Sequence, residues 1–168
     1  MVKGGKKLKK IAVIGGDKRE IKLIDILSKK YHVNVLGYAE KINELNDNIY
    51  YYSDIKKVLK DVEVVIAPMS GTDEDGNLKS SFIDEKVNLN SDFFDMLDPE
   101  TIFLIGKAVP VVKNIIKSKN VKYIEMANSD ELAILNAIPT AEGAIKIAIE
   151  KTDITIHQSN ILILGLGK

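Results

Sequence analysis

The chain has 168 residues, 45% of them hydrophobic, which is enough to bury the core of one domain. Its 24 Lys and Arg residues balance 24 Asp and Glu residues, which argues against a dedicated nucleic-acid-binding protein, because such proteins carry a basic excess. The lack of cysteine excludes disulfides, thiol nucleophiles and cysteine-bound metals, and it fits a reducing cytoplasm.

Residues 1–9 read as a flexible basic arm, because lysine and glycine dominate them. The arm has no apolar core long enough for a signal peptide or a membrane helix, so we expect neither export nor membrane insertion. We also predict no metal site. The two histidines, His32 and His157, lie far apart, and the calcium-like stretch that begins at Asp73 has Leu78 where an EF-hand loop requires glycine.

Five apolar segments alternate with helical patterns and predict the strands of one sheet. They are residues 8–14, 33–37, 62–67, 101–105 and 121–126. Between them, Asp17 and Glu20 form a capping box for one helix, and Pro110 suits the first position of another. Strands that are apolar throughout are typical of parallel sheets with helices on both faces. We therefore predict an α/β fold with a doubly wound, mostly parallel five-stranded sheet of Rossmann or flavodoxin type.

Ligands of such sheets bind beyond the carboxyl ends of the strands. The segments predicted there are Gly15-Gly16, 68–72, Gly106-Lys107 and 126–128. Ser70 and Thr72 offer hydroxyl groups and Lys107 offers a cation, which suits a ligand that carries carboxylates. Ordinary turn chemistry for the two hydroxyls and a solvated lysine are the alternative interpretations.

The C-terminal part has the pattern of a connection into a second domain. Pro139 blocks a preceding helix, Thr140 can cap the next one, and Glu142 places a carboxylate in its first turn. We expect this helix to end near Lys151, where residues typical of turns follow.

Residues 161–164 form an unbroken apolar run typical of a buried strand, and Gly165-Leu166-Gly167 follows at once. A strand that ends in Gly-x-Gly is typical of the start of a dinucleotide-binding unit. Without the sheet of that unit, the apolar arm would be left in water, so we expect two copies to associate as a homodimer. The alternatives are that the arm folds back on its own domain, or that it stays disordered and makes the protein prone to aggregate.

Three motifs occur in a specific order: PMSGT at 68–72, NAIPTAEG at 136–143 and TDITIH at 152–157, after the opening IAVIGGD. With them the chain resembles the family of the A subunit of dipicolinate synthase, from Lys10 to Lys168, over little more than the first half of that subunit. The resemblance implies an N-terminal substrate domain at 10–138, an interdomain helix and linker at 139–158, and the first strand and Gly-x-Gly of a truncated Rossmann domain at 159–168.

The resemblance also implies a function. In that family a dihydrodipicolinate ring is oxidised to dipicolinate, hydride passes to NAD(P), and the reaction takes place in the mother-cell cytoplasm of a sporulating bacterium, where the partner is the B subunit of the enzyme. The implied site residues are substrate contacts, residues that line the interdomain cleft, and glycines that bind the cofactor. The implied substrate contacts are Ser70, Gly71, Thr72 and Lys107. The residues that line the cleft are Thr140, Glu142 and Gly143, and the glycines that bind the cofactor are Gly165 and Gly167.

Within this set Glu142 is the expected proton acceptor, with an ordinary first-turn helix carboxylate as the alternative. Other functions stay open. One is the substrate domain of a 2-hydroxy-acid or alanine dehydrogenase, and another is a domain that only holds a partner protein. A signalling receiver domain is disfavoured, because no aspartate ends the third predicted strand.

Overall fold

The computed structural model describes residues 9–37, 47–83 and 85–165, and the statements below concern these residues. Most of the predicted basic arm and Gly167 lie outside them. The chain divides into two units, Met1–Met126 and Ala127–Lys168, which are described separately.

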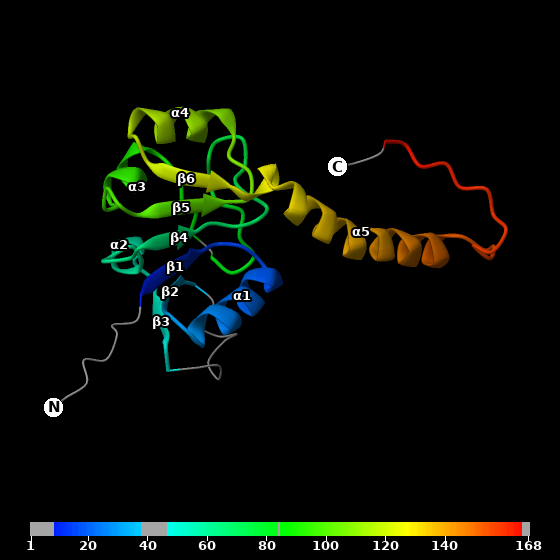
Figure 1. Cartoon of the computed structure of the whole chain (residues 1–168), viewed down its shortest axis with the longest axis horizontal. Helices are drawn as coiled ribbons and strands as arrows, with labels where there is room; N and C mark the ends of the chain where they lie inside the picture. The colour runs from blue at the N-terminus through cyan, green and yellow to red at the C-terminus, as the bar shows by residue number, and fades with distance from the viewer. Residues whose placement is uncertain (1–8, 38–46, 84, 166–168) are drawn as a thin grey trace. The chain divides into compact units, whose positions relative to one another are not determined.

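Six strands of the first unit pair in parallel in the order β3-β2-β1-β4-β5-β6 (Figure 1). They are β1 Lys10–Ile14, β2 His32–Leu36, β3 Ile49–Tyr52, β4 Val64–Ile66, β5 Ile102–Ile105 and β6 Lys122–Glu125. The chain moves outward from β1 to β3, returns to the centre, and moves outward in the other direction from β4 to β6. The predicted α/β doubly wound parallel sheet is confirmed, with β1 and β4 at the point where the direction changes.

The predicted number of five strands is wrong, because β3 was missed. Its sequence, Ile-Tyr-Tyr-Tyr, follows a polar stretch, and only Ile49 of its four residues is buried. β3 lies at the edge of the sheet and pairs with β2 from Val33 to Leu36. An edge strand needs no unbroken apolar run, since much of its surface faces water. Pairing with β2 stabilises β3 as a strand, although its sequence does not have the pattern of a buried strand.

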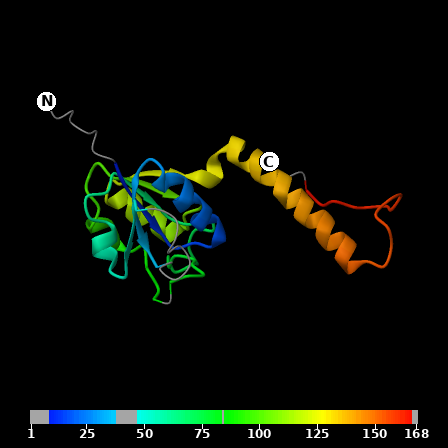
Figure 2. The same ribbon diagram turned by 90° about the horizontal axis from the view of Figure 1, so that it is seen from below.

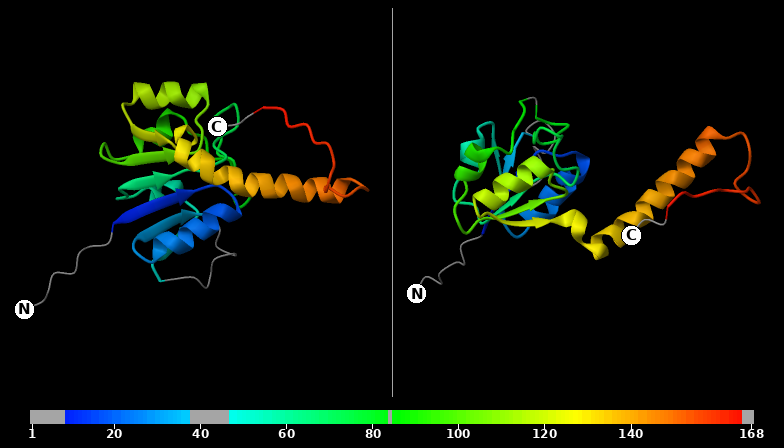
Figure 3. Two further views of the ribbon diagram at one scale, coloured as in Figure 1. Left: turned by 45° about the vertical axis from the view of Figure 1, so that its right-hand side comes forward. Right: turned by 90° about the horizontal axis from the view of Figure 1, so that it is seen from above.

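Four helices of the first unit cover the two faces of the sheet (Figure 3). They are α1 Lys18–Ser28, α2 Ile55–Val58, α3 Ser91–Asp95 and α4 Pro110–Ser118. Ile24 of α1 packs with Val13 and Val33 in one core, while α2, α3 and α4 pack around Phe103 and Ala12 in the other. The two cores follow from the strand period of two, which sends Ala12 and Val13 to opposite faces. The capping box before α1 and the proline at the start of α4 are both confirmed.

The second unit contains one long helix, α5 Asp130–Lys151, which runs without a break through Pro139 (Figure 2). The predicted start at Thr140 is therefore wrong, although the predicted end is confirmed. Ser129 is the N-cap, and its hydroxyl accepts a hydrogen bond from the amide of Leu132 at 3.3 Å. Pro139 lacks only one backbone donor, and the Thr140 hydroxyl donates to the carbonyl of Asn136 at 2.7 Å instead of capping a helix.

Residues 161–164 form no strand in the described part of the chain, and the predicted first strand of a second domain stays a prediction. A strand requires a partner edge, and none of the six described strands pairs with this segment. Its side chains are exposed, up to 87% for Leu164. The helix α5 is long and apolar enough to cross a bilayer, but these two properties do not distinguish a membrane helix from one that packs on protein.

Candidate functional site

The loops that follow β4 and β5 touch through their backbones at the carboxyl edge of the sheet. A Cβ atom on Gly106 would lie 1.9 Å from the carbonyl oxygen of Met69, and one on Gly71 would lie 2.2 Å from that of Lys107. Both Gly71 and Gly106 donate their amide hydrogens to the carbonyl oxygen of Pro68, at 2.9 and 3.1 Å. The structure thus brings together two of the four segments predicted at this edge, because only glycine permits this approach.

The predicted substrate contacts differ in exposure. The side chains of Ser70 and Lys107 are exposed, one on each of the two touching loops. Thr72 is only 4% exposed, and its hydroxyl has no hydrogen-bond partner among the described residues. An unpaired buried hydroxyl is unfavourable. Ser70 and Lys107 are therefore accessible to a ligand in this structure, whereas Thr72 is not.

Glu20 links the loops after β1 and β4, where the sheet changes direction. Its carboxylate accepts hydrogen bonds from the amides of Asp17 at 2.7 Å and Met69 at 3.2 Å, and the residue is 5% exposed. The sequence revealed only the first bond, because Met69 lies 49 residues away. The signal that could have found it is helical spacing, which places Glu20 on the same inward face as Ile24.

The turn after β1 is filled by other parts of the chain. The amide of Gly16 donates to the carbonyl oxygen of Lys79 at 3.0 Å, and the amide of Ser81 donates to the carbonyl oxygen of Gly16 at 2.8 Å. The carboxylates of Asp17 and Glu20 occupy the region where a nucleotide phosphate would meet the N-terminus of α1. Hydrogen bonds from the side chain and amide of Arg19 lower the pKa of Asp17, which therefore keeps its negative charge. This turn does not fit a dinucleotide.

A second buried acid, Glu125, holds the loop that carries Lys107. One carboxylate oxygen accepts a hydrogen bond from the amide of Ala108 at 3.0 Å, and the other pairs with the ammonium group of Lys113 at 2.9 Å. The hydrogen bond to Glu125 raises the pKa of Lys113, so this lysine stays charged. The sequence alone did not indicate Glu125 as a component of the site. The sequence feature that could have indicated it is a carboxylate at the end of a strand that also contains apolar residues.

The polar loop after β4 is closed by Asp73. Its carboxylate accepts hydrogen bonds from the amides of Asp75 at 3.1 Å and Asn77 at 2.8 Å, and from the side-chain amide of Asn77 at 2.9 Å. These bonds, led by that from the Asn77 side chain, lower the pKa of Asp73. The stretch that resembles a calcium loop is thus an internally bonded turn, and no group of metal ligands is found among the described residues.

Acid should open this turn. In the folded chain, the pKa of Asp73 lies below its ordinary value of 3.8. The ionised carboxylate therefore stabilises the turn fully above pH 3.8, and this stabilisation is lost as the pH falls through the lower pKa of the folded chain. We expect the amide resonances of Asp75 and Asn77 to shift together in an NMR titration with a midpoint below 3.8. Asp73→Asn should abolish this step, whereas Asp75→Asn, which alters an exposed carboxylate, should keep it. A step that survives in Asp73→Asn would contradict this assignment.

The remaining predicted site residues lie in the second unit. Glu142 is exposed on α5, and the Thr140 hydroxyl is bound to the helix backbone. Apart from the adjacent backbone of α5 itself, no described atom lies within 4 Å of the position that a Cβ on Gly143 would take, so nothing described in the chain requires glycine there. Gly165 has a φ of +92°, which favours glycine. The roles of these residues in substrate and cofactor binding stay predictions.

Comparison with known proteins identifies the family. Residues 10–127 match the family described as the N-terminal domain of the A subunit of dipicolinate synthase. The chain belongs to this family. The family match confirms the resemblance inferred from the motifs, and it spans both loops of the candidate site.

Three comparisons support the assignment. The A subunit of dipicolinate synthase from Bacillus subtilis (strain 168) is 31% identical over 160 residues, which are 95% of this chain and 54% of the relative. The crystal structure of the corresponding Bacillus halodurans protein has a TM-score of 0.85 at 30% identity and covers 96% of this chain and 56% of that one. The crystal structure of the Bacillus subtilis protein has a TM-score of 0.76 at 29% identity, with coverage of 90% and 51%. The chain thus spans about half the length of these relatives.

Proposed function

We propose that the chain is the substrate-side half of the A subunit of a dipicolinate synthase, which oxidises dihydrodipicolinate to dipicolinate with NAD(P) as the hydride acceptor. The observation that carries the proposal is the family match over residues 10–127. The matched region contains the exposed hydroxyl of Ser70 and the exposed ammonium group of Lys107, on loops that touch.

These two side chains suit a substrate with carboxylates. The Lys107 ammonium group supplies a charge-assisted hydrogen bond and the Ser70 hydroxyl a second donor. Glu125 and Gly71 hold the two loops in place, so the donors are positioned before a substrate arrives. By contrast, a cavity of about 420 Å³ nearby is lined by Asp54, Glu85 and Asp92 against a single lysine, which disfavours a dicarboxylate there.

Oxidation of the ring removes one hydride and one proton. Bound NAD(P) would accept the hydride, and Glu142 is our proposed acceptor of the proton. The turn after β1 is filled by Glu20 and does not fit the cofactor. Gly165 does fit the first glycine of a phosphate-binding turn, because its φ is positive and space is open around it.

The setting of the reaction is part of the proposal. We place the protein in the cytoplasm of the mother cell during sporulation, where its partner is the B subunit of the enzyme. We also propose a homodimer, in which the exposed apolar residues 161–164 help to join two copies. No nucleic-acid partner is proposed, since the chain has no net charge.

The proposal predicts the kinetics of two variants. In the protein encoded by the whole reading frame, Ser70→Ala or Lys107→Ala should lower kcat/KM for dihydrodipicolinate by about one to two decades, because each removes a charge-assisted hydrogen bond. The rate of dipicolinate formation measures the reaction.

The matched control is Lys117→Ala, which removes an exposed lysine of α4 and should leave kcat/KM unchanged. If both site variants keep the full rate but hold the B subunit less tightly, the domain is an interaction module and does not contact substrate. The absence of oxidation when the unmodified protein is mixed with the B subunit would reject the proposed reaction itself.

A further inference from the structure

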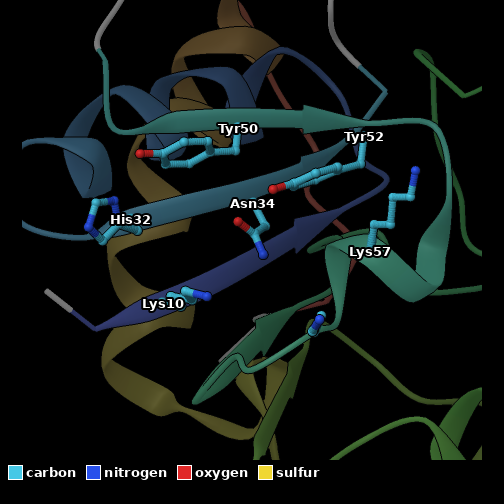
Figure 4. A pocket seen from close by; sticks show the side chains of 7 residues that line it. Lys10, His32, Asn34, Tyr50, Tyr52 and Lys57 are labelled. Carbon is cyan, nitrogen blue, oxygen red and sulfur yellow. The ribbon is translucent and has the colours of Figure 1, made fainter. Parts of the chain in front are cut away.

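A basic cavity lies on the face of the sheet opposite α1, over β1, β2 and β3 (Figure 4). Its volume is about 320 Å³, within the range of small-molecule sites. Lys10 and His32 are the first residues of their strands, so this end of the cavity lies at the amino edge of the sheet. The loops with Ser70 and Lys107 lie at the carboxyl edge, and the cavity is thus separate from the candidate substrate site.

The cavity exists because the chain leaves this part of the sheet uncovered. The helix after β3, α2, has only four residues, and its buried residue Val58 covers the sheet at one end only. Strand residues of the same face, Lys10, Asn34 and Tyr52, therefore point into an open hollow (Figure 4). A longer helix at this place, as is usual between parallel strands, would fill it.

Three lysines surround the cavity, and no acidic residue lines it in the described part of the chain. Lys57 and Lys60 form no ion pair with any described residue, and the ammonium group of Lys10 is 3.7 Å from one carboxylate oxygen of Asp61. The whole chain has a net charge of zero, so this gathering of positive charge is local and does not follow from composition. The electrostatic complement is an anion with more than one negative charge.

The same cavity offers aromatic surface and polar groups. Figure 4 shows the rings of Tyr50 and Tyr52 side by side along β3, with the Tyr52 hydroxyl directed toward the centre above Asn34. Asn34 is 5% exposed, and its amide nitrogen donates to the carbonyl of Val58 at 2.9 Å, which fixes its orientation. The ring of His32 is 5.6 Å from that of Tyr50, and its Nδ1 atom is buried with no hydrogen-bond partner among the described residues.

We propose that this cavity binds a small aromatic ring that carries two or more negative charges, on carboxylate or phosphate groups. The anionic groups meet the ammonium groups of Lys10, Lys57 and Lys60, and the ring lies against the tyrosine side chains. A ligand needs both an aromatic ring, to contact the tyrosines, and more than one negative charge, to pair with the lysines. Carboxylate and phosphate groups share this chemistry.

The test is NMR titration of the whole 168-residue chain with matched probes. Isophthalate combines a ring with two carboxylates, glutarate has two carboxylates without a ring, and isophthalamide has the ring without charge. Phenyl phosphate separates phosphate from carboxylate recognition. We expect isophthalate or phenyl phosphate to shift the amides of β2 and β3 and to bind more tightly than glutarate, and isophthalamide to show no binding.

The charge variants decide whether the cavity is responsible. Lys57→Gln with Lys60→Gln should weaken binding about tenfold or more, because two charge-assisted contacts are lost. The control, Lys30→Gln with Lys117→Gln, removes the same charge at exposed positions outside the cavity and should leave affinity unchanged. Tyr50→Leu should remove the preference for isophthalate over glutarate. Equal weakening by both double variants, or shifts confined to residues 68–72 and Lys107, would overturn the proposal.

Discussion

Gly71→Ala should destabilise the first unit by on the order of 4 kcal/mol. Two independent costs add. Alanine would have to adopt a φ of +69°, which L-residues avoid, and its Cβ would lie 2.2 Å from the carbonyl oxygen of Lys107. Backbone atoms cannot rotate away as a side chain can, so the loops after β4 and β5 would have to separate.

Urea unfolding monitored by circular dichroism measures this loss. Gly76→Ala is the matched control, because Gly76 has a similar φ of +86° but its Cβ would meet only side-chain atoms, the nearest of them Cγ2 of Val112 at 3.1 Å. It should cost about 1–2 kcal/mol, the strain of the backbone alone. Equal losses in the two variants would mean that the contact of Gly71 with Lys107 does not determine stability.

Glu20→Ala should destabilise the first unit by about 2–4 kcal/mol. The change removes the acceptor for the amides of Asp17 and Met69, and both donors then lie in a partly buried position without a partner. It also empties the space beside Gly16, whose Cβ position is 2.4 Å from the Glu20 side chain. The loops after β1 and β4 would lose their link, so turnover in the protein encoded by the whole reading frame should fall as well.

Glu20→Gln separates the two contributions of this side chain. It keeps the volume and one acceptor oxygen but places an amide group against one of the two donors, so its loss of stability should be about half that of Glu20→Ala. Glu74→Ala, at an exposed position of the loop after β4, is the control and should unfold like the parent chain. A Glu20→Ala variant as stable as this control would show that water replaces the carboxylate at no cost.

The loops at the carboxyl edge of the sheet show which features local sequence patterns can predict. The sequence predicted that the segments with Ser70 and Lys107 follow separate strands, and that strands of this type are parallel and end at one edge. The contact between the two loops was not predicted, and the structure shows that glycine at positions 71 and 106 permits it. The burial of Thr72 was not predicted either, because it depends on how the loop pairs with itself through Leu78.

The differences between the predicted and the observed secondary structure have a common origin. They depend on interactions between residues that are far apart in sequence. Pro139 was expected to end a helix, yet one missing donor is tolerated when Ser129 starts the helix well before it. Residues 161–164 have the composition of a strand but no partner edge. Composition states what a segment can become, and a neighbouring strand decides whether it does.

By itself, the sequence determined the fold class, the capping box at Asp17 and the family, since each depends on periodicity, local hydrogen bonding or a short motif. Tertiary structure alone decided the pairing of β3, the link from Glu20 to Met69 across 49 residues, and the basic cavity over β1 to β3. The physical reason is that backbone hydrogen-bonding groups and the exposed surface of a sheet acquire neighbours only when the chain folds. These neighbours come from strands and loops that are far apart in sequence.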